Sequence, residues 1–154
     1  MRLLIASHIY MYTVGLACRQ LGAERVMLTD LDKAQELLRA NIALNRGPDE
    51  SQHVTAHSLL WGNRDQAQAL HPPVDLVVAT DVIYEYKFLD PLIQTLTHLS
   101  GPNTVIYLAY RSRGLTFEQE QEAFVKLKET FKVQQTQYVE KDFLNISIWV
   151  LTTK

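Results

Sequence analysis

The chain has little cysteine: Cys18 is the only one among 154 residues. A single cysteine cannot form an internal disulfide, so the fold must be held by its apolar core, as is usual in a reducing compartment. Cys18 also lies in an apolar stretch, which favours a buried small side chain over a nucleophile. We therefore expect a cytoplasmic protein that is stabilised without disulfides.

Long apolar runs are also absent. No run approaches the roughly 20 residues that a membrane-spanning helix needs, and the apolar patch after Arg2 is too short for a secretory signal, so we predict a strand there. Hydrophobic residues make up 47% of the chain and charged residues 21%, the balance of a globular domain. A chain of 154 residues supports one core, which predicts a single domain over 1–154 that acts as a monomer and binds no membrane.

The chain also lacks a large excess of either positive or negative charge. The formal net charge is −2, and lysines and arginines are scattered along the chain. The chain therefore lacks the basic face that binds nucleic acid, and we expect no nucleic-acid partner. Four histidines, His53, His57, His71 and His98, lack the spacing to a cysteine or carboxylate that a metal site needs, so no metal is predicted.

The sequence does contain a regular alternation of apolar strands with amphipathic helices. The predicted strands are 3–6, 25–29, 54–59, 74–79 and 104–110, the predicted helices are 12–21, 32–45, 90–99 and 116–130, and the segments 132–139 and 146–152 form a final antiparallel hairpin. Segment 64–73 is polar and ends in two prolines, which predicts a connection with room for one helical turn. This alternation implies right-handed crossovers and a mostly parallel sheet with helices on both faces.

Three of the predicted strands are followed by side chains with functional chemistry. Asp30 ends the second strand, the pair Trp61-Gly62 follows the third, and a buried apolar run ends in Asp81 with Tyr84 three residues later. The carboxyl ends of parallel strands meet at one edge of a sheet, where α/β proteins bind their ligands. We therefore predict that Asp30, Trp61, Asp81 and Tyr84 surround one cleft at this edge.

With Asp81-Val-Ile-Tyr84, Val26-Met-Leu-Thr-Asp30 and Trp61-Gly62, the chain resembles, over residues 13–152, the seven-β-strand methyltransferases that use S-adenosylmethionine (SAM), in particular the DxxY group that methylates protein lysines. The resemblance implies an α/β, Rossmann-like sheet with helices on both faces and an antiparallel C-terminal hairpin. It also implies methyl transfer from SAM to a lysine of a protein substrate. The segment Tyr110-Arg-Ser-Arg113 makes it closest to the branch that acts on AAA chaperone ATPases, which are the expected substrate class.

The resemblance assigns three residues to the cofactor. Asp30 would accept hydrogen bonds from the ribose hydroxyls; alternatively it caps the next helix, a role for which Asp32 is better placed. Trp61 would cover the adenine, although a lone tryptophan more often fills a core. Thr80 would lie near the adenosine, at a position where the family usually has alanine.

The resemblance makes Asp81 and Tyr84 the catalytic residues. A lysine amine, with an ordinary pKa of about 10.4, must lose its proton before it attacks a methyl group, which costs about 4–5 kcal/mol at pH 7. A carboxylate beside the ammonium orients it but also raises its pKa, so Asp81 is expected to position the lysine and not to act as a strong base. Tyr84 would shape the transfer channel. The alternative is that Asp81 caps the next helix and Tyr84 packs as a lid.

The glycine-rich loop that binds SAM in this family is absent. Ala6 stands at its acidic position, and His8, Tyr10 and Tyr12 stand at its glycine positions. Side chains there keep the backbone from approaching the cofactor. We therefore expect an altered first strand and cofactor loop, weakened SAM binding, and Tyr10 or Tyr12 filling part of the site. The chain resembles an N-terminally truncated methyltransferase, and the alternative is a non-catalytic protein-binding module that no longer holds SAM.

Overall fold

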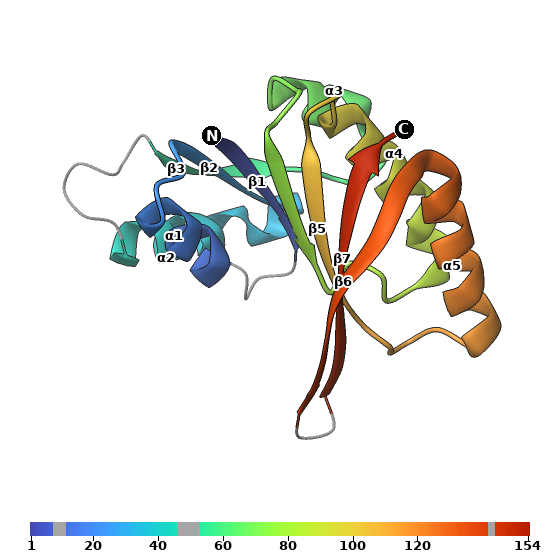
Figure 1. The fold of residues 1–154 in the computed structure, drawn as a ribbon. Helices are drawn as coiled ribbons and strands as arrows, with labels where there is room; N and C mark the ends of the chain where they lie inside the picture. Colours follow the sequence, from blue (N-terminus) through green and yellow to red (C-terminus); the bar gives the residue numbers. More distant parts are fainter. Residues whose placement is uncertain (8–11, 46–52, 142–143) are drawn as a thin grey trace.

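The computed structural model describes residues 1–7, 12–45, 53–141 and 144–154. Within them, one sheet contains seven strands in the order β3-β2-β1-β4-β5-β7-β6 (Figure 1). The strands are β1 (Arg2–Ser7), β2 (Arg25–Asp30), β3 (Val54–Ser58), β4 (Leu76–Thr80), β5 (Val105–Arg111), β6 (Phe131–Lys141) and β7 (Leu144–Thr153). The first five strands run parallel, and β7 runs antiparallel to both of its neighbours. The predicted α/β fold with an antiparallel C-terminal hairpin is confirmed.

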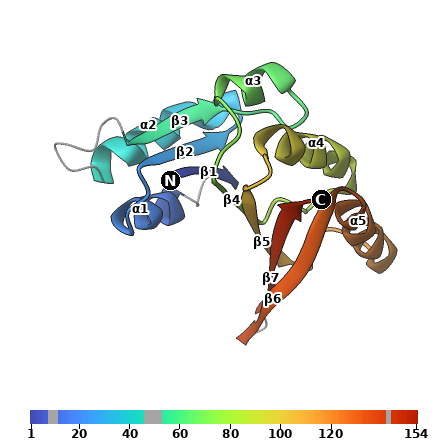
Figure 2. The same ribbon diagram turned by 45° about the horizontal axis from the view of Figure 1, so that its top comes forward.

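Helices cover both faces of this sheet. They are α1 (Tyr12–Gln20), α2 (Gln35–Asn45), α3 (Arg64–Ala69), α4 (Leu89–Leu99) and α5 (Phe117–Thr130). The pair α1 and α2 lies on one face, and α3, α4 and α5 lie on the other (Figures 1 and 2). None of the helices in the described segments is both long enough and apolar enough to cross a membrane.

Each face of the sheet has its own hydrophobic core. Neighbouring residues of the central strands point to opposite faces, so Leu3 packs with α1 and α2 whereas Leu4 packs with the helices of the other face. Both leucines are completely buried. Burial on two faces explains why the central strands are nearly continuous apolar runs in the sequence.

Two segments differ from the sequence-based expectation. Segment 64–73 contains the six-residue helix α3, because the Asn63 side chain accepts a hydrogen bond from the Gln66 N–H at its start and Ala67 is fully buried. The predicted helix over 32–45 begins as the 3₁₀ turn η2 (Asp32–Ala34) ahead of α2. Leu31 occupies the cap position of η2 and no side chain caps it, so the assignment of Asp32 as a helix cap is wrong.

The C-terminal hairpin is longer than the strand that it joins. Strand β7 pairs with β5 as far as Ile146, opposite Arg111, whereas β6 and β7 continue to pair as far as Lys141 and Leu144. The end of the hairpin therefore projects beyond the rest of the sheet, as Figure 1 shows.

Candidate active site

Asp30 presents an unsatisfied carboxylate oxygen at the carboxyl end of β2. Its Oδ1 accepts a hydrogen bond from the Leu31 N–H at 2.7 Å. Its Oδ2 is buried and finds no hydrogen-bond partner within the described residues. The N-cap position of η2 is occupied by Leu31, and no side-chain hydrogen bond caps this turn, so Asp30 does not act as its cap. A buried carboxylate oxygen without a partner is costly, so this atom is suited to accept a hydrogen bond from a ligand.

Gln35 fixes the ends of the two strands that carry this edge of the site. It is buried at the start of α2, and its Nε2 donates to the backbone carbonyls of Asp30, at 3.1 Å, and His57, at 2.8 Å. These bonds join β2 to β3 where their backbone ladder ends. The sequence reasoning did not identify Gln35, although a glutamine at an otherwise buried helix position could have drawn attention to it.

Trp61 is held at the rim by a tight turn on α4. Gly62 has a φ of +84°, a conformation that favours glycine, and its N–H donates to Thr95 Oγ1 at 2.8 Å. Thr95 is buried and its hydroxyl donates to the Pro91 carbonyl, so the turn is anchored to the helix backbone. This explains why a glycine follows the tryptophan and leaves the indole facing the pocket.

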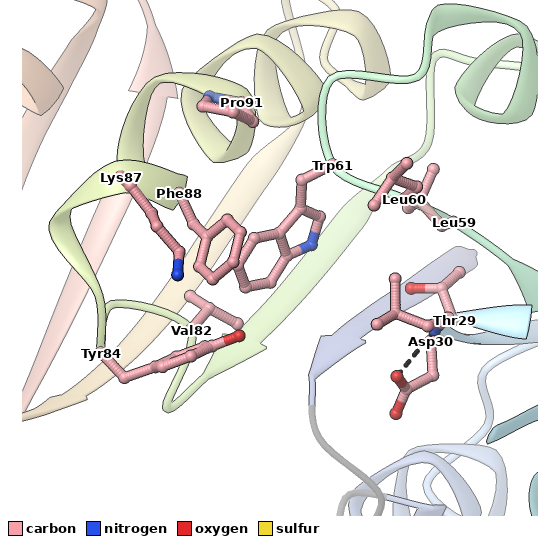
Figure 3. A pocket seen from close by; sticks show the side chains of 11 residues that line it. Thr29, Asp30, Leu59, Leu60, Trp61, Val82, Tyr84, Lys87, Phe88 and Pro91 are labelled. Atoms are coloured by element: carbon pink, nitrogen blue, oxygen red, sulfur yellow. Dashed lines mark hydrogen bonds between the residues drawn. The ribbon is translucent and has the colours of Figure 1, made fainter. Parts of the chain in front are cut away.

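Three aromatic rings form one wall of that pocket (Figure 3). The ring centroids of Trp61, Tyr84 and Phe88 lie 6.0–6.4 Å apart, in tilted or edge-on arrangements. The Lys87 Nζ lies 4.7 Å from the Phe88 centroid and forms an ion pair with Glu85. Phe88 was not identified from the sequence; it is the residue that brings the start of α4 to the wall.

The pocket has a volume of about 450 Å³ and two chemically different sides. Asp30 lies across from the aromatic wall in Figure 3, and the remaining lining is mostly apolar: Leu31, Leu59, Leu60, Val82 and Pro91. The volume falls in the usual range of small-molecule sites. A flat apolar ring that carries hydroxyls at one end fits this distribution of groups.

The Tyr84 phenol is neutral in this environment. Burial raises its pKa, and the Glu85 and Asp30 carboxylates raise it further, against smaller opposing effects of Lys87 and Arg113. The hydroxyl therefore keeps its proton at neutral pH and can donate a hydrogen bond into the pocket.

Asp81 is held from both its backbone and its side chain. Its φ is +57°, unusual for a residue with a side chain, and its N–H donates to the Ala109 carbonyl. The Arg113 Nε donates to Oδ1 at 2.8 Å, and the Arg113 Nη2 forms a short contact with Oδ2. The 3₁₀ turn η3 (Tyr86–Phe88) and helix α4 follow Asp81 in the chain. Their N-cap positions are occupied by Glu85 and Phe88, neither of which makes a side-chain capping hydrogen bond, so Asp81 caps neither element.

Asp81 and Thr80 line a second, smaller pocket. It measures about 330 Å³ and is shared with Ala109, Arg111 and Arg113. The structure divides the predicted cleft into two pockets at the same edge of the sheet: Asp30, Trp61 and Tyr84 line the first, and Asp81, on the other side of the turn 81–84, lines the second. Thr80 also lies there, with its hydroxyl buried and unpartnered within the described residues.

Gly114, which the sequence reasoning also missed, packs against the turn 81–84. Its φ is +75°, and a Cβ on it would lie 2.4 Å from the Tyr84 carbonyl oxygen. Arg113 and Gly114 thus hold both ends of this turn, one through the Asp81 side chain and the other through the Tyr84 backbone. A glycine directly after an arginine in the loop that follows β5 was the available clue.

This packing predicts a stability effect at Gly114. Gly114→Ala should lower the free energy of unfolding by about 2–4 kcal/mol, from left-handed backbone strain together with overlap on the Tyr84 carbonyl. Gly22→Ala is the matched control, because Gly22 has a φ of +98° but open space around it; it should cost only about 1–2 kcal/mol. Urea unfolding measures both. Equal losses would show that Gly114 is not closely packed on Tyr84.

Part of the predicted site lies outside the described residues. This applies to His8 and Tyr10 and to the side chain of Tyr12, whose backbone opens α1. The predicted filling of the site by Tyr10 or Tyr12 therefore stays a prediction. Among the residues that the structure covers, no cluster of three or more histidine, cysteine, aspartate or glutamate side chains could hold a metal ion.

Solved structures with a similar fold include two methyltransferases. The methyltransferase domain of bacterial CtHen1-C matches with a TM-score of 0.75 and 14% sequence identity. The match covers 99% of this chain and 89% of the CtHen1-C chain. The magnesium protoporphyrin IX methyltransferase of Synechocystis, solved with bound SAM, has a TM-score of 0.68 and 13% identity, and covers 100% of this chain and 70% of its own. At this identity the likeness concerns the fold.

Sequence relatives are closer. Protein N-lysine methyltransferase METTL21A is 34% identical in Danio rerio, over 81% of this chain and 55% of that protein. The Mus musculus protein of the same name is 34% identical over 84% of this chain and 57% of that protein. EEF1A lysine methyltransferase 3 of Xenopus tropicalis is 35% identical over 65% of this chain and 42% of that protein. The chain thus spans little more than half the length of the METTL21A relatives.

The sequence profile of the family described as lysine methyltransferase matches residues 13–131. This range contains Asp30, Trp61, Thr80, Asp81 and Tyr84. On this match and the identity to METTL21A, the chain belongs to the lysine methyltransferase family.

Proposed function

We propose that this protein is a SAM-dependent N-methyltransferase acting on lysines of a protein substrate. The observation that carries the proposal is the position of Asp30 at one side of an apolar pocket, opposite the aromatic wall, with a buried carboxylate oxygen that has no hydrogen-bond partner among the described residues. Membership of the lysine methyltransferase family supports the same activity.

The described residues fit the nucleoside end of SAM. Asp30 would accept hydrogen bonds from the vicinal ribose hydroxyls, as carboxylates at the ends of strands do in nucleotide-binding folds. Trp61 and Phe88 offer ring faces and edges to the adenine. Thr80, whose hydroxyl has no hydrogen-bond partner in the described part of the chain, would contact the cofactor from the second pocket, beyond the turn 81–84.

Asp81 and Tyr84 would act on the target lysine. When bound, SAM supplies a methyl group on a positively charged sulfur, which keeps the bonding electrons as the nitrogen–carbon bond forms. The lysine ammonium would first lose a proton to water, and Asp81 would orient the resulting neutral amine through hydrogen bonds so that attack is in line. Tyr84, on the boundary of the first pocket, narrows the path between amine and methyl group.

The substrate class is proposed at two levels. A protein lysine is supported by the names of the relatives, which are protein-lysine methyltransferases. An AAA chaperone ATPase is the specific candidate, supported by the Tyr110-Arg-Ser-Arg113 segment, and elongation factor eEF1A is the comparison substrate because one relative is named for it. We further propose a monomer that acts in the cytoplasm, in keeping with the lone cysteine.

Cofactor binding can be followed at Trp61 itself. The chain has two tryptophans, Trp61 and Trp149. Trp149 stacks on Phe124 and lines neither pocket described above. In Trp149→Phe, SAM should therefore change the indole fluorescence, whereas in Trp61→Phe it should not. Equal responses of the two variants would place the cofactor elsewhere.

Transfer is then tested with tritiated SAM on an AAA chaperone ATPase and on eEF1A. Label on a lysine of the AAA protein supports the full proposal, and label on eEF1A alone supports the activity with the other substrate. SAM binding at Trp61 without label on any lysine of a cell extract would contradict the assignment of lysine methyltransferase activity. Absence of both binding and transfer would favour the non-catalytic protein-binding module.

A further inference from the structure

The Asp81 carboxylate is engaged by a cation from a different part of the chain. Arg113, in the loop that follows β5, directs two nitrogens of its guanidinium at the two oxygens of Asp81. Such a fork fixes the plane of the carboxylate. It also occupies one acceptor position on each oxygen and leaves the others open to a further donor.

Among the described residues, the other charged groups around the turn 81–84 form no hydrogen bond or ion pair with this carboxylate. The titratable and charged groups nearby are Tyr84, Glu85 and Lys87 on the same segment, Tyr110 and Arg111 on β5, Glu120 on α5, and Asp30 across the first pocket. Glu85 is paired with Lys87, and Glu120 accepts a hydrogen bond from Ser112. Within the described residues, Arg113 is the cation that contacts Asp81.

The pair is accessible enough for a substrate to reach it. The side chains of Arg113 and Asp81 are 46% and 43% exposed. Exposed ion pairs contribute little to stability, so Arg113 can tilt or share the Asp81 carboxylate with a substrate at little cost. An amine entering the second pocket would therefore meet a carboxylate whose charge is already compensated.

This compensation bears directly on lysine chemistry. A lone carboxylate stabilises the ammonium form of a neighbouring lysine and raises its pKa, and each unit of that rise leaves about tenfold less neutral amine at a fixed pH. A guanidinium on the same carboxylate opposes this effect. Asp81 can then orient the amine through its free acceptor positions without holding it in the charged, unreactive form.

We propose that Arg113 is a positioning residue that limits how strongly Asp81 holds the target lysine as its ammonium. The proposal rests on the methyltransferase function given above. It assigns to the loop after β5 a part in setting the protonation of the substrate, in addition to holding the turn 81–84 in place.

The kinetic test uses Arg113→Gln, which keeps a polar side chain that can donate hydrogen bonds but shortens it and removes the charge. We expect a lower KM for the protein substrate, a kcat about three- to tenfold lower near neutral pH, and an apparent pKa of the kcat profile raised by about 0.5–1 unit. At alkaline pH the kcat of Arg113→Gln should approach that of the unmodified chain. Arg113→Lys should restore most of the profile, and Arg111→Gln, in the same pocket without a contact to Asp81, should shift it much less.

A binding test keeps the inference separate from the enzyme assignment. Nα-acetyl-lysine methylamide is titrated into the chain at neutral pH and followed by the NMR shift of the Asp81 amide. Arg113→Gln should bind it about three- to tenfold more tightly than the unmodified chain, and Asp81→Asn more weakly. The norleucine analogue, which lacks the amine, should show no such difference. Unchanged or weaker binding by Arg113→Gln overturns the proposal whether or not methyl transfer is observed.

Discussion

Asp81→Asn should reduce methyl transfer to lysine roughly a hundredfold or more while SAM affinity stays within about twofold. Asparagine tolerates the left-handed backbone found at this position, so the variant removes charge with little added strain. The amine then loses an acceptor that orients it, and the unpaired Arg113 repels the incoming ammonium. Single-turnover transfer rates and SAM calorimetry on the same preparation measure the two quantities.

Asp65→Asn is the matched control, because Asp65 is exposed on α3 and lines neither pocket. It should change neither transfer nor cofactor binding. A loss of less than about threefold in Asp81→Asn would remove Asp81 from the reaction. A parallel loss of SAM affinity would instead assign it to the cofactor.

Asp30→Ala should weaken SAM binding by about a hundredfold, because each hydrogen bond to a charged group contributes about 1.5–3 kcal/mol. The thermal midpoint should change little, because the loss of the hydrogen bond from the Leu31 N–H to Oδ1 is offset by removal of Oδ2, a buried oxygen without a partner among the described residues. Calorimetry with SAM and a melting curve of the free protein separate binding from stability.

Asp32→Ala provides the comparison for this second variant. Asp32 is exposed two residues further along the chain and caps no helix. Its loss should leave SAM affinity unchanged. If Asp30→Ala binds SAM as well as the unmodified chain, the first pocket is not the ribose site, and the buried oxygen needs another explanation.

The sequence was most informative about strand ends. Asp30 and Asp81 could be placed at one edge of the sheet because parallel strands joined by helices bring their carboxyl ends together. Trp61-Gly62 could be placed in a turn because a glycine after a strand permits a positive φ. The resemblance added the family, which the comparison with known proteins confirmed.

Helix α3 shows a limit of the same reasoning. Its segment is polar and ends in two prolines, and an apolar periodicity is absent. The helix forms because Asn63 caps it and Ala67 reaches the core beneath α4. Short helices depend on such caps and on packing more than on the propensities of their residues.

Local pattern was sufficient for the order of the strands and of the longer helices, the parallel sheet and the chemical identity of the candidate residues, because each depends on side-chain periodicity or on the end of a single strand. The pairing of Arg113 with Asp81, the contact of Gly114 with Tyr84, and the separation of Asp81 from the pocket of Asp30 required the folded chain. The two contacts join segments about 30 residues apart. Their geometry depends on how β4 and β5 align in the sheet and on the left-handed turn at Asp81, which no local pattern encodes.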